Sequence, residues 1–91
     1  MYKSEKLAKI VLTNLYNIKN EVDELDDFFL NFLHIDVSKD SKNITCYYKT
    51  SNENKNNIIQ YFIKNTLYIK HLLLNRIKMR KFPNIKFVYH A

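Results

Sequence analysis

The chain has 91 residues, which is enough for one small domain but too few for a large catalytic fold with a deep pocket. Its hydrophobic content of 46%, with 14% aromatic residues, supports a compact core and argues against disorder. Its single cysteine excludes an internal disulfide, and its formal net charge of +6 favours an anionic partner. We therefore expect residues 1–91 to form a single domain.

No apolar stretch of the sequence approaches the roughly 18 residues that a membrane-spanning helix needs. The first residues, MYKSEKLAK, lack the hydrophobic segment of a signal peptide. A lone cysteine also suits a reducing compartment. We expect a cytoplasmic protein without a membrane partner.

The positive charge is concentrated in the C-terminal part of the chain. Up to Glu53 there are seven lysines against nine acidic residues, whereas after Glu53 there are six lysines, two arginines and no acidic residue. This asymmetry favours an anionic partner for the C-terminal part, with nucleic acid as the first candidate and an anionic membrane surface as the second. A solvated, solubilising surface is the plainer interpretation of the same pattern.

The first periodic segment predicts a helix over residues 4–22, with Ser4 as its N-cap. Its apolar residues recur at helical spacing: Leu7, Ile10, Val11, Leu15, Ile18 and Val22.

The pattern then changes to a period of two, which predicts a hairpin of two strands around a turn at residues 39–42. If Ser38 lies opposite Asn43, the apolar residues of both strands share one face. The expected pairs are Val37 with Ile44, Ile35 with Cys46 and Leu33 with Tyr48 on the inner face, and His34 with Tyr47 and Asp36 with Thr45 on the outer face.

A second helical region follows Ser51 and Asn52, which are suitable capping residues. Pro83 removes Phe82 from the helical conformation, so this region should end near Lys78. Its apolar stripe comprises Ile58, Ile59, Phe62, Ile63, Ile69, Leu72, Leu73 and Ile77, and a last strand should turn Ile85, Phe87 and Tyr89 inward. The sequence thus predicts an α+β fold with helices on one face of a three-stranded sheet.

The sequence offers little support for catalysis. General acid–base chemistry needs titratable groups that lie together, but His34, His71 and His90 belong to three different elements. The chain has no glycine, which excludes a P-loop, a GxGxxG loop and an ordinary GxxG loop of KH domains. We expect no enzyme activity, no metal, no cofactor and no small-molecule substrate, and we interpret Cys46 as a small core residue.

A row of cations is the strongest functional pattern in the sequence. With a rotation of 100° per residue, the basic side chains of this row lie opposite the apolar stripe of the second helical region. There each could neutralise a phosphate of a nucleic acid without reading its sequence. The row comprises Lys64, His71 and Lys78, with Lys70 on its flank and Arg80 and Lys81 beyond the helix end.

Three further residues of this region have unusual positions. Arg76 falls within the apolar stripe, where its stem can pack while its guanidinium reaches solvent. Tyr61 and Tyr68 lie at the edge of the stripe, and we interpret them as core residues rather than as platforms for base stacking.

Two stretches of the chain resemble the ribosome-binding factor A family. Residues 35–40, IDVSKD, followed by residues 44–48, resemble the family's V-x-V-S-x-D strand, turn and returning strand. Residues 77–89, IKMRKFPNIKFVY, resemble its L-R-L-R-x-x-P-E-L-x-F-x-x-D ending. The matched order and spacing extend over nearly the whole chain.

The resemblance implies a type II KH-like fold of the order α-β-β-α-α-β, in agreement with the order expected above. It also implies a non-enzymatic ribosome assembly factor that binds the immature 30S subunit and its 16S rRNA, and we expect it to be a monomer. Such a factor assists late maturation and rRNA processing and is important in the cold.

The family's Ala-x-Gly kink between its two later helices aligns here with Asn65, Thr66 and Leu67. Because Leu67 cannot take a positive φ cheaply, either the kink forms by other means or the two helices run together. Asn and Thr form helices less readily and can hydrogen-bond locally, so we expect the axis to be interrupted near residues 64–67.

We therefore predict an RNA-binding surface on the second helical region. Its candidate residues are Lys64, Asn65, Thr66, Lys70, Lys78, Arg80 and Lys81. Two alternatives remain: a KH-like RNA-binding protein that acts off the ribosome, and a protein-interaction module that uses the acidic residues 21–27.

Overall fold

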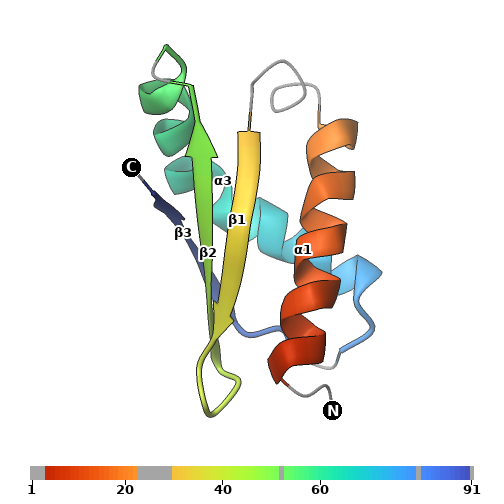
Figure 1. Cartoon of the computed structure of the whole chain (residues 1–91). Coiled ribbons are helices and arrows are strands. Elements are labelled where there is room, and N and C mark those ends of the chain that lie inside the picture. Colours follow the sequence, from red (N-terminus) through yellow and green to blue (C-terminus); the bar gives the residue numbers. More distant parts are fainter. Residues whose placement is uncertain (1–3, 23–29, 52, 80, 91) are drawn as a thin grey trace.

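The computed structural model describes residues 4–22, 30–51, 53–79 and 81–90 of the chain. Within them the elements follow the order α1 (Ser4–Glu21), β1 (Leu30–Val37), β2 (Asn43–Thr50), α3 (Lys55–Arg76) and β3 (Asn84–Tyr89). Figure 1 shows the two helices and the three-stranded sheet that these elements form. The predicted α+β class is confirmed.

The helix α1 forms as its apolar spacing predicts. Leu7, Val11, Leu15 and Ile18 are all buried on the side that contacts β1. The amide of Val22 still donates to the carbonyl of Ile18 at 2.9 Å, so the helical turn continues to the predicted end.

The strands β1 and β2 pair antiparallel in the predicted register over most of their length. Val37 pairs with Ile44, Ile35 with Cys46, His34 with Tyr47 and Asp36 with Thr45. The prediction for Leu33 was wrong, because a β-bulge between Phe32 and His34 shifts the register there. The bulge places the side chain of Phe32 in the core opposite Tyr48 and leaves Leu33 37% exposed.

The side chain of Tyr16 on α1 supports this bulge. Its hydroxyl accepts the backbone N–H of Phe32 at 3.1 Å and donates to Oδ1 of Asn31 at 2.6 Å. The rings of Tyr16 and Phe32 also meet edge to face at 5.3 Å. The helix therefore satisfies a backbone donor at the point where the strand pairing is irregular.

The strand β3 pairs parallel to β2, which makes β2 the central strand of the order β1-β2-β3. Its pairing places Ile85 beside Ile44, Phe87 beside Cys46 and Tyr89 beside Tyr48. These residues share the inner face of the sheet, as predicted. The connection from β2 to β3 runs through α3, as a parallel pairing requires.

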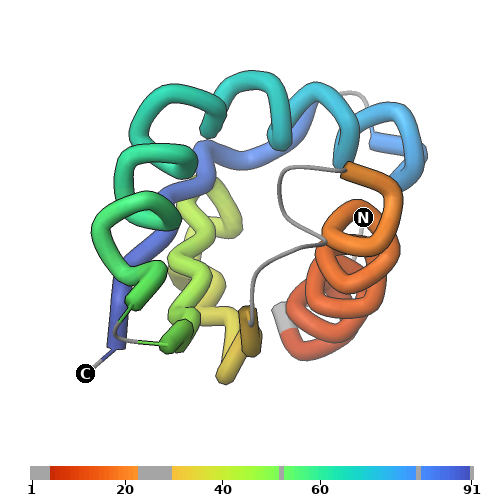
Figure 2. Tube along the Cα trace, turned by 90° about the horizontal axis from the view of Figure 1, so that it is seen from above, coloured from red at the N-terminus to blue at the C-terminus, as the bar shows by residue number. Residues whose placement is uncertain are grey.

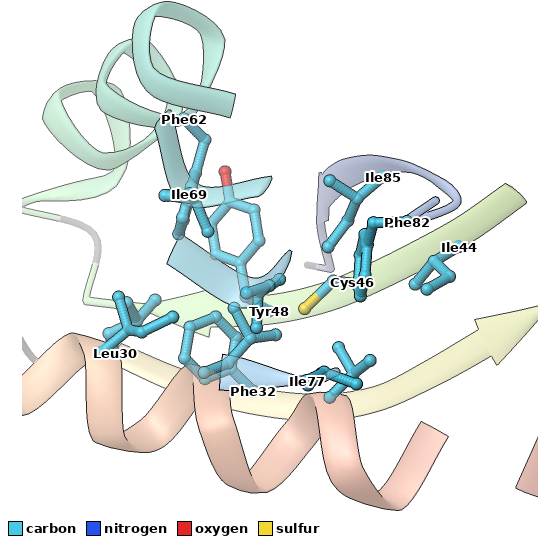
Figure 3. Packing of buried hydrophobic residues seen from close by; sticks show 14 of the residues in the cluster. Leu30, Phe32, Ile44, Cys46, Tyr48, Phe62, Ile69, Ile77, Phe82 and Ile85 are labelled. Carbon is cyan, nitrogen blue, oxygen red and sulfur yellow. The ribbon is translucent and has the colours of Figure 1, made fainter. Parts of the chain in front are cut away.

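The core lies between this inner face and the two helices (Figure 2). Phe62 of α3 occupies its aromatic centre, with its ring stacked on Phe87 at 4.2 Å and tilted against Tyr48 at 4.8 Å. Figure 3 shows Phe62 and Tyr48 with other buried side chains between the sheet and the helices. Cys46 is fully buried among them, so its interpretation as a core residue is confirmed.

The helix α3 is continuous from Lys55 to Arg76, so the two later helices of the predicted order are one helix here. It starts after Asn54, slightly later than Ser51 and Asn52 suggested, and it ends two residues before Lys78. Its axis nevertheless bends, and Figures 1 and 2 show its two halves running in different directions. The helix α3 is therefore bent, but its helical structure is not interrupted between Lys55 and Arg76.

Candidate nucleic-acid interface

The cations predicted on the outer face of the second helical region are exposed where the structure describes them. Lys64 and His71 are exposed on α3, and Lys78 and Lys81 are exposed beyond its end. Arg80 lies outside the described residues, as do residues 23–27 of the acidic segment. The four exposed side chains can reach a phosphate backbone without first leaving a partner in the core.

Lys70 differs from the exposed candidate cations, because it is half-buried and its side chain forms a hydrogen bond within the protein. Its Nζ donates to Oδ1 of Asn84 at 3.3 Å, which links α3 to the first residue of β3. An amide oxygen carries no formal charge, so this hydrogen bond is not an ion pair.

Asn65 and Thr66 bond within the helix. Nδ2 of Asn65 donates to the carbonyl of Tyr61 at 2.9 Å, and the hydroxyl of Thr66 donates to the carbonyl of Phe62. Side chains that bond to the preceding turn in this way bend helices. These two residues therefore explain the bend in the absence of glycine, and their remaining oxygen lone pairs can accept hydrogen bonds from a ligand.

Arg76 does not join the row of cations. Its guanidinium forms an ion pair with the carboxylate of Glu21, and Nη1 lies 3.4 Å from Oε1. The pair joins the last residue of α3 to the last residue of α1.

Sequence reasoning missed a group of exposed apolar side chains on the same helix. Ile63 is 67% exposed, Leu67 79% and Tyr68 51%. The assignments of Ile63 to the buried stripe and of Tyr68 to the core were wrong, whereas Tyr61 does pack against Phe62. A straight helical wheel places Tyr68 only about 40° from Lys64, so its assignment to the core gave too much weight to its aromatic ring.

A groove of about 320 Å³ runs between α3 and β3. Ile59, Ile63 and Thr66 line it from the helix, and Lys86 and Tyr89 line it from the strand. Lys86 is exposed at its rim, so the groove combines apolar walls with a cation.

The outer face of the sheet carries a second aromatic feature. His34 stacks on Tyr47 with a ring separation of 4.5 Å, and its Nε2 lies 3.8 Å from Oδ2 of Asp36. His34 and Cys46 lie on opposite faces, as expected from the register.

The described residues contain no cluster of three or more His, Cys, Asp or Glu side chains that could hold a metal ion. Burial raises the pKa of the Cys46 thiol well above its ordinary value, which makes it a poor nucleophile. Neither helix in the described part of the chain is long and apolar enough to cross a bilayer.

The fold and its surface define a small basic α+β protein with a bent helix that carries exposed cations across a three-stranded mixed sheet. Residues 3–91 match the family Ribosome-binding factor A. The chain belongs to the ribosome-binding factor A family.

Solved structures show the same fold. The crystal structure of ribosome-binding factor A from Thermus thermophilus has a TM-score of 0.81 at 17% sequence identity, over 96% of this chain and 94% of that chain. The solution NMR structure of a Thermotoga maritima protein described as a ribosome binding factor A has a TM-score of 0.63 at 15% identity, over 93% of this chain and 80% of that chain. Comparison with curated proteins finds no match.

Proposed function

We propose that this protein is a ribosome assembly factor that binds the immature 30S subunit and contacts its 16S rRNA. Membership of the ribosome-binding factor A family over residues 3–91 carries this proposal. The protein acts in the cytoplasm as a monomeric KH-like ribosome-binding domain, without catalysis or a cofactor. It assists late maturation and rRNA processing, with its greatest importance in the cold.

The proposed contact surface is the outer face of α3 and the segment that follows it. Lys64, Lys78 and Lys81 are exposed there, and the chain has no acidic residue after Glu53 to compete with RNA phosphates. Each phosphate neutralised by a lysine releases counterions, which adds affinity and makes binding sensitive to salt. We also propose phosphate contacts for Lys70 and Arg80, and we propose that Asn65 and Thr66 accept hydrogen bonds from ribose hydroxyls.

Salt titration of binding to a small-subunit RNA fragment tests the electrostatic part of the proposal. If four to six phosphates are contacted, the slope of log affinity against log salt should be roughly −3 to −5. A flat dependence would exclude a surface of this kind.

Charge reversal tests the location of the surface. Lys64→Glu with Lys70→Glu should weaken co-sedimentation with small subunits by at least about tenfold, because two attractions become repulsions. The matched control is Lys9→Glu with Lys19→Glu on α1, which changes the net charge equally. Equal effects of the two pairs would show that only net charge matters.

Ribosome profiles separate the proposal from its alternatives. Cells that lack the protein should accumulate immature small subunits, most strongly in the cold. RNA binding without association with small subunits would favour a KH-like protein that acts off the ribosome. Indifference to RNA would favour a protein-interaction module.

A further inference from the structure

The helix α3 carries exposed apolar side chains near its bend that do not pack in the core. Leu67 is 79% exposed and Tyr68 is 51% exposed, although both lie in the middle of a helix whose opposite side buries Ile58, Phe62, Ile69 and Leu73. Ile63, which is 67% exposed, lies one turn before Leu67. Single exposed apolar residues are ordinary on protein surfaces, but a group of them beside charged residues marks a contact surface.

These side chains are interleaved with cations. Relative to Lys64, a helical rotation of 100° per residue places Leu67 about 60° to one side and Tyr68 about 40° to the other. His71 lies between them, one turn further along. The outer side of the bend therefore presents a leucine and a tyrosine on either side of a line formed by Lys64 and His71, and Nε2 of His71 lies 3.4 Å from Nδ2 of Asn75.

The charge around this group indicates what covers it. All charged residues of α3 are basic, and so are all charged residues that follow it, which disfavours a cationic partner and suits a polyanion. A fully paired RNA helix offers phosphates and hydroxyls but hides the faces of its bases. Unpaired nucleotides offer both phosphates for the lysines and base faces for an aromatic ring.

We propose that Tyr68 and Leu67 form a platform for unpaired RNA bases, with Lys64 and His71 holding the adjoining phosphates. The proposal rests on the RNA-binding function proposed above and adds the kind of RNA that the bend recognises. One base stacks on the Tyr68 ring, and its ribose or a neighbouring base packs on Leu67.

Stacking and phosphate contacts have different salt signatures, which allows each residue's part to be measured. Tyr68→Ala should lower the affinity for a single-stranded oligoadenylate of about 12 nucleotides roughly tenfold and leave the salt slope unchanged. Leu67→Ala should lower it about threefold, because less apolar surface is covered. Lys64→Ala should instead reduce the salt slope by about 0.7.

A fluorescent variant gives a direct readout of stacking. The chain has no tryptophan, so Tyr68→Trp introduces a single indole that keeps an aromatic face at this position. Oligoadenylate should quench its fluorescence and bind with at least wild-type affinity, whereas a perfectly paired RNA duplex should leave the fluorescence unchanged. Asn17→Trp, at an exposed position on α1, is the matched control and should not be quenched.

The outcomes are distinct. Loss of affinity in Lys64→Ala with wild-type binding in Tyr68→Ala and Leu67→Ala would overturn the platform and leave the RNA-binding function intact. Failure of the wild-type protein to bind any RNA would overturn both. Equal losses on duplex and single-stranded RNA would also refute recognition of unpaired bases. Unchanged melting temperatures of the variants exclude unfolding as the cause, since both side chains are exposed.

Discussion

The two helices cover the same face of the sheet but differ in the residues that they expose to solvent. On α1, the apolar residues Leu7, Val11, Leu15 and Ile18 are buried, and the exposed residues are all polar or charged. On α3, four apolar residues are likewise buried, but a second set including Leu67 is exposed to solvent.

The difference between the two helices distinguishes apolar residues that are needed to form the core from apolar residues that are not. Burial of one apolar face accounts for every large apolar residue of α1 that the structure assigns to the core. The same argument accounts for only one side of α3. Burial alone does not account for the composition of the outer side of α3, which supports the proposal of an RNA contact there.

Substitutions on the two sides of α3 should have very different effects on stability. Phe62→Ala should lower the free energy of unfolding by about 3–5 kcal/mol, because it removes the ring that packs on Phe87 and Tyr48. Leu67→Ala should change it by less than about 0.5 kcal/mol. Urea unfolding followed by circular dichroism measures both values.

Leu15→Ala on α1 provides the matching value for the first helix, and about 2–5 kcal/mol is expected there. If Phe62→Ala fails to fold, Phe62→Leu retains most of the buried volume and keeps the comparison measurable. A destabilisation by Leu67→Ala as large as that of Leu15→Ala would show that the outer side of α3 belongs to the core.

Local periodicity was sufficient to predict most of the hairpin but not its irregular end. Four residues on either side of the turn pair as expected, because alternation and turn position fix the register. The bulge at Phe32 depends on the hydroxyl of Tyr16, which comes from another element and accepts the freed N–H. Alternation within a strand contains no information about such a partner.

The site was predictable in its charges but not in its shape. Lys64 and Lys78 are exposed as expected, since cations placed opposite an apolar stripe face solvent, and Lys81, expected beyond the helix end, is exposed as well. The bend follows from back-bonding by Asn65 and Thr66, which the sequence allows but does not require. A straight helical wheel already places Tyr68 about 40° from Lys64, so its assignment to the core was an error of interpretation and not a limit of the wheel.

High pH should weaken the inner face on which α3 packs. Burial raises the pKa of Tyr48 to about 12, with smaller contributions from Cys46 and Tyr89, and burial also raises the pKa of the Cys46 thiol. The folded protein thus holds protons that the unfolded chain releases, so stability is complete below the ordinary values of 9.0 and 10.0 and falls as pH rises above them.

Urea unfolding at a series of alkaline pH values measures this loss. Tyr48→Phe should flatten the decrease, and Tyr68→Phe, which changes an exposed tyrosine, should not. A decrease of equal steepness in Tyr48→Phe would assign the alkaline sensitivity to other groups.

The contact between the ends of the two helices should contribute little. Arg76 and Glu21 form an exposed ion pair, and such pairs contribute about 0.2–1 kcal/mol after solvent screening. A double-mutant cycle of Arg76→Ala and Glu21→Ala should give a coupling energy in this range that shrinks as salt is added. A coupling above about 2 kcal/mol would mean that the pair is essential to how α1 and α3 meet.

The smallest expected effect lies in the hairpin turn, which both helices leave uncovered. Oδ1 of Asp40 accepts the Ser38 hydroxyl at 2.6 Å and the Lys42 N–H at 3.0 Å. These hydrogen bonds, led by that of Ser38, hold the pKa of Asp40 below its ordinary value of 3.8. A depressed carboxyl pKa supports the folded state above the ordinary value, and this support is lost as pH falls through the depressed value.

An NMR titration of the Asp40 carboxyl carbon should therefore give a midpoint below 3.8 in the wild-type protein. Ser38→Ala should return the midpoint toward 3.8, because it removes the strongest donor to the charged form. Leu67→Ala on α3 should leave the midpoint unchanged. Since the turn is exposed and its bonds are local, a shift in Leu67→Ala would mean that α3 and the hairpin turn are coupled through the sheet, and that the outer side of the helix is not independent of the fold.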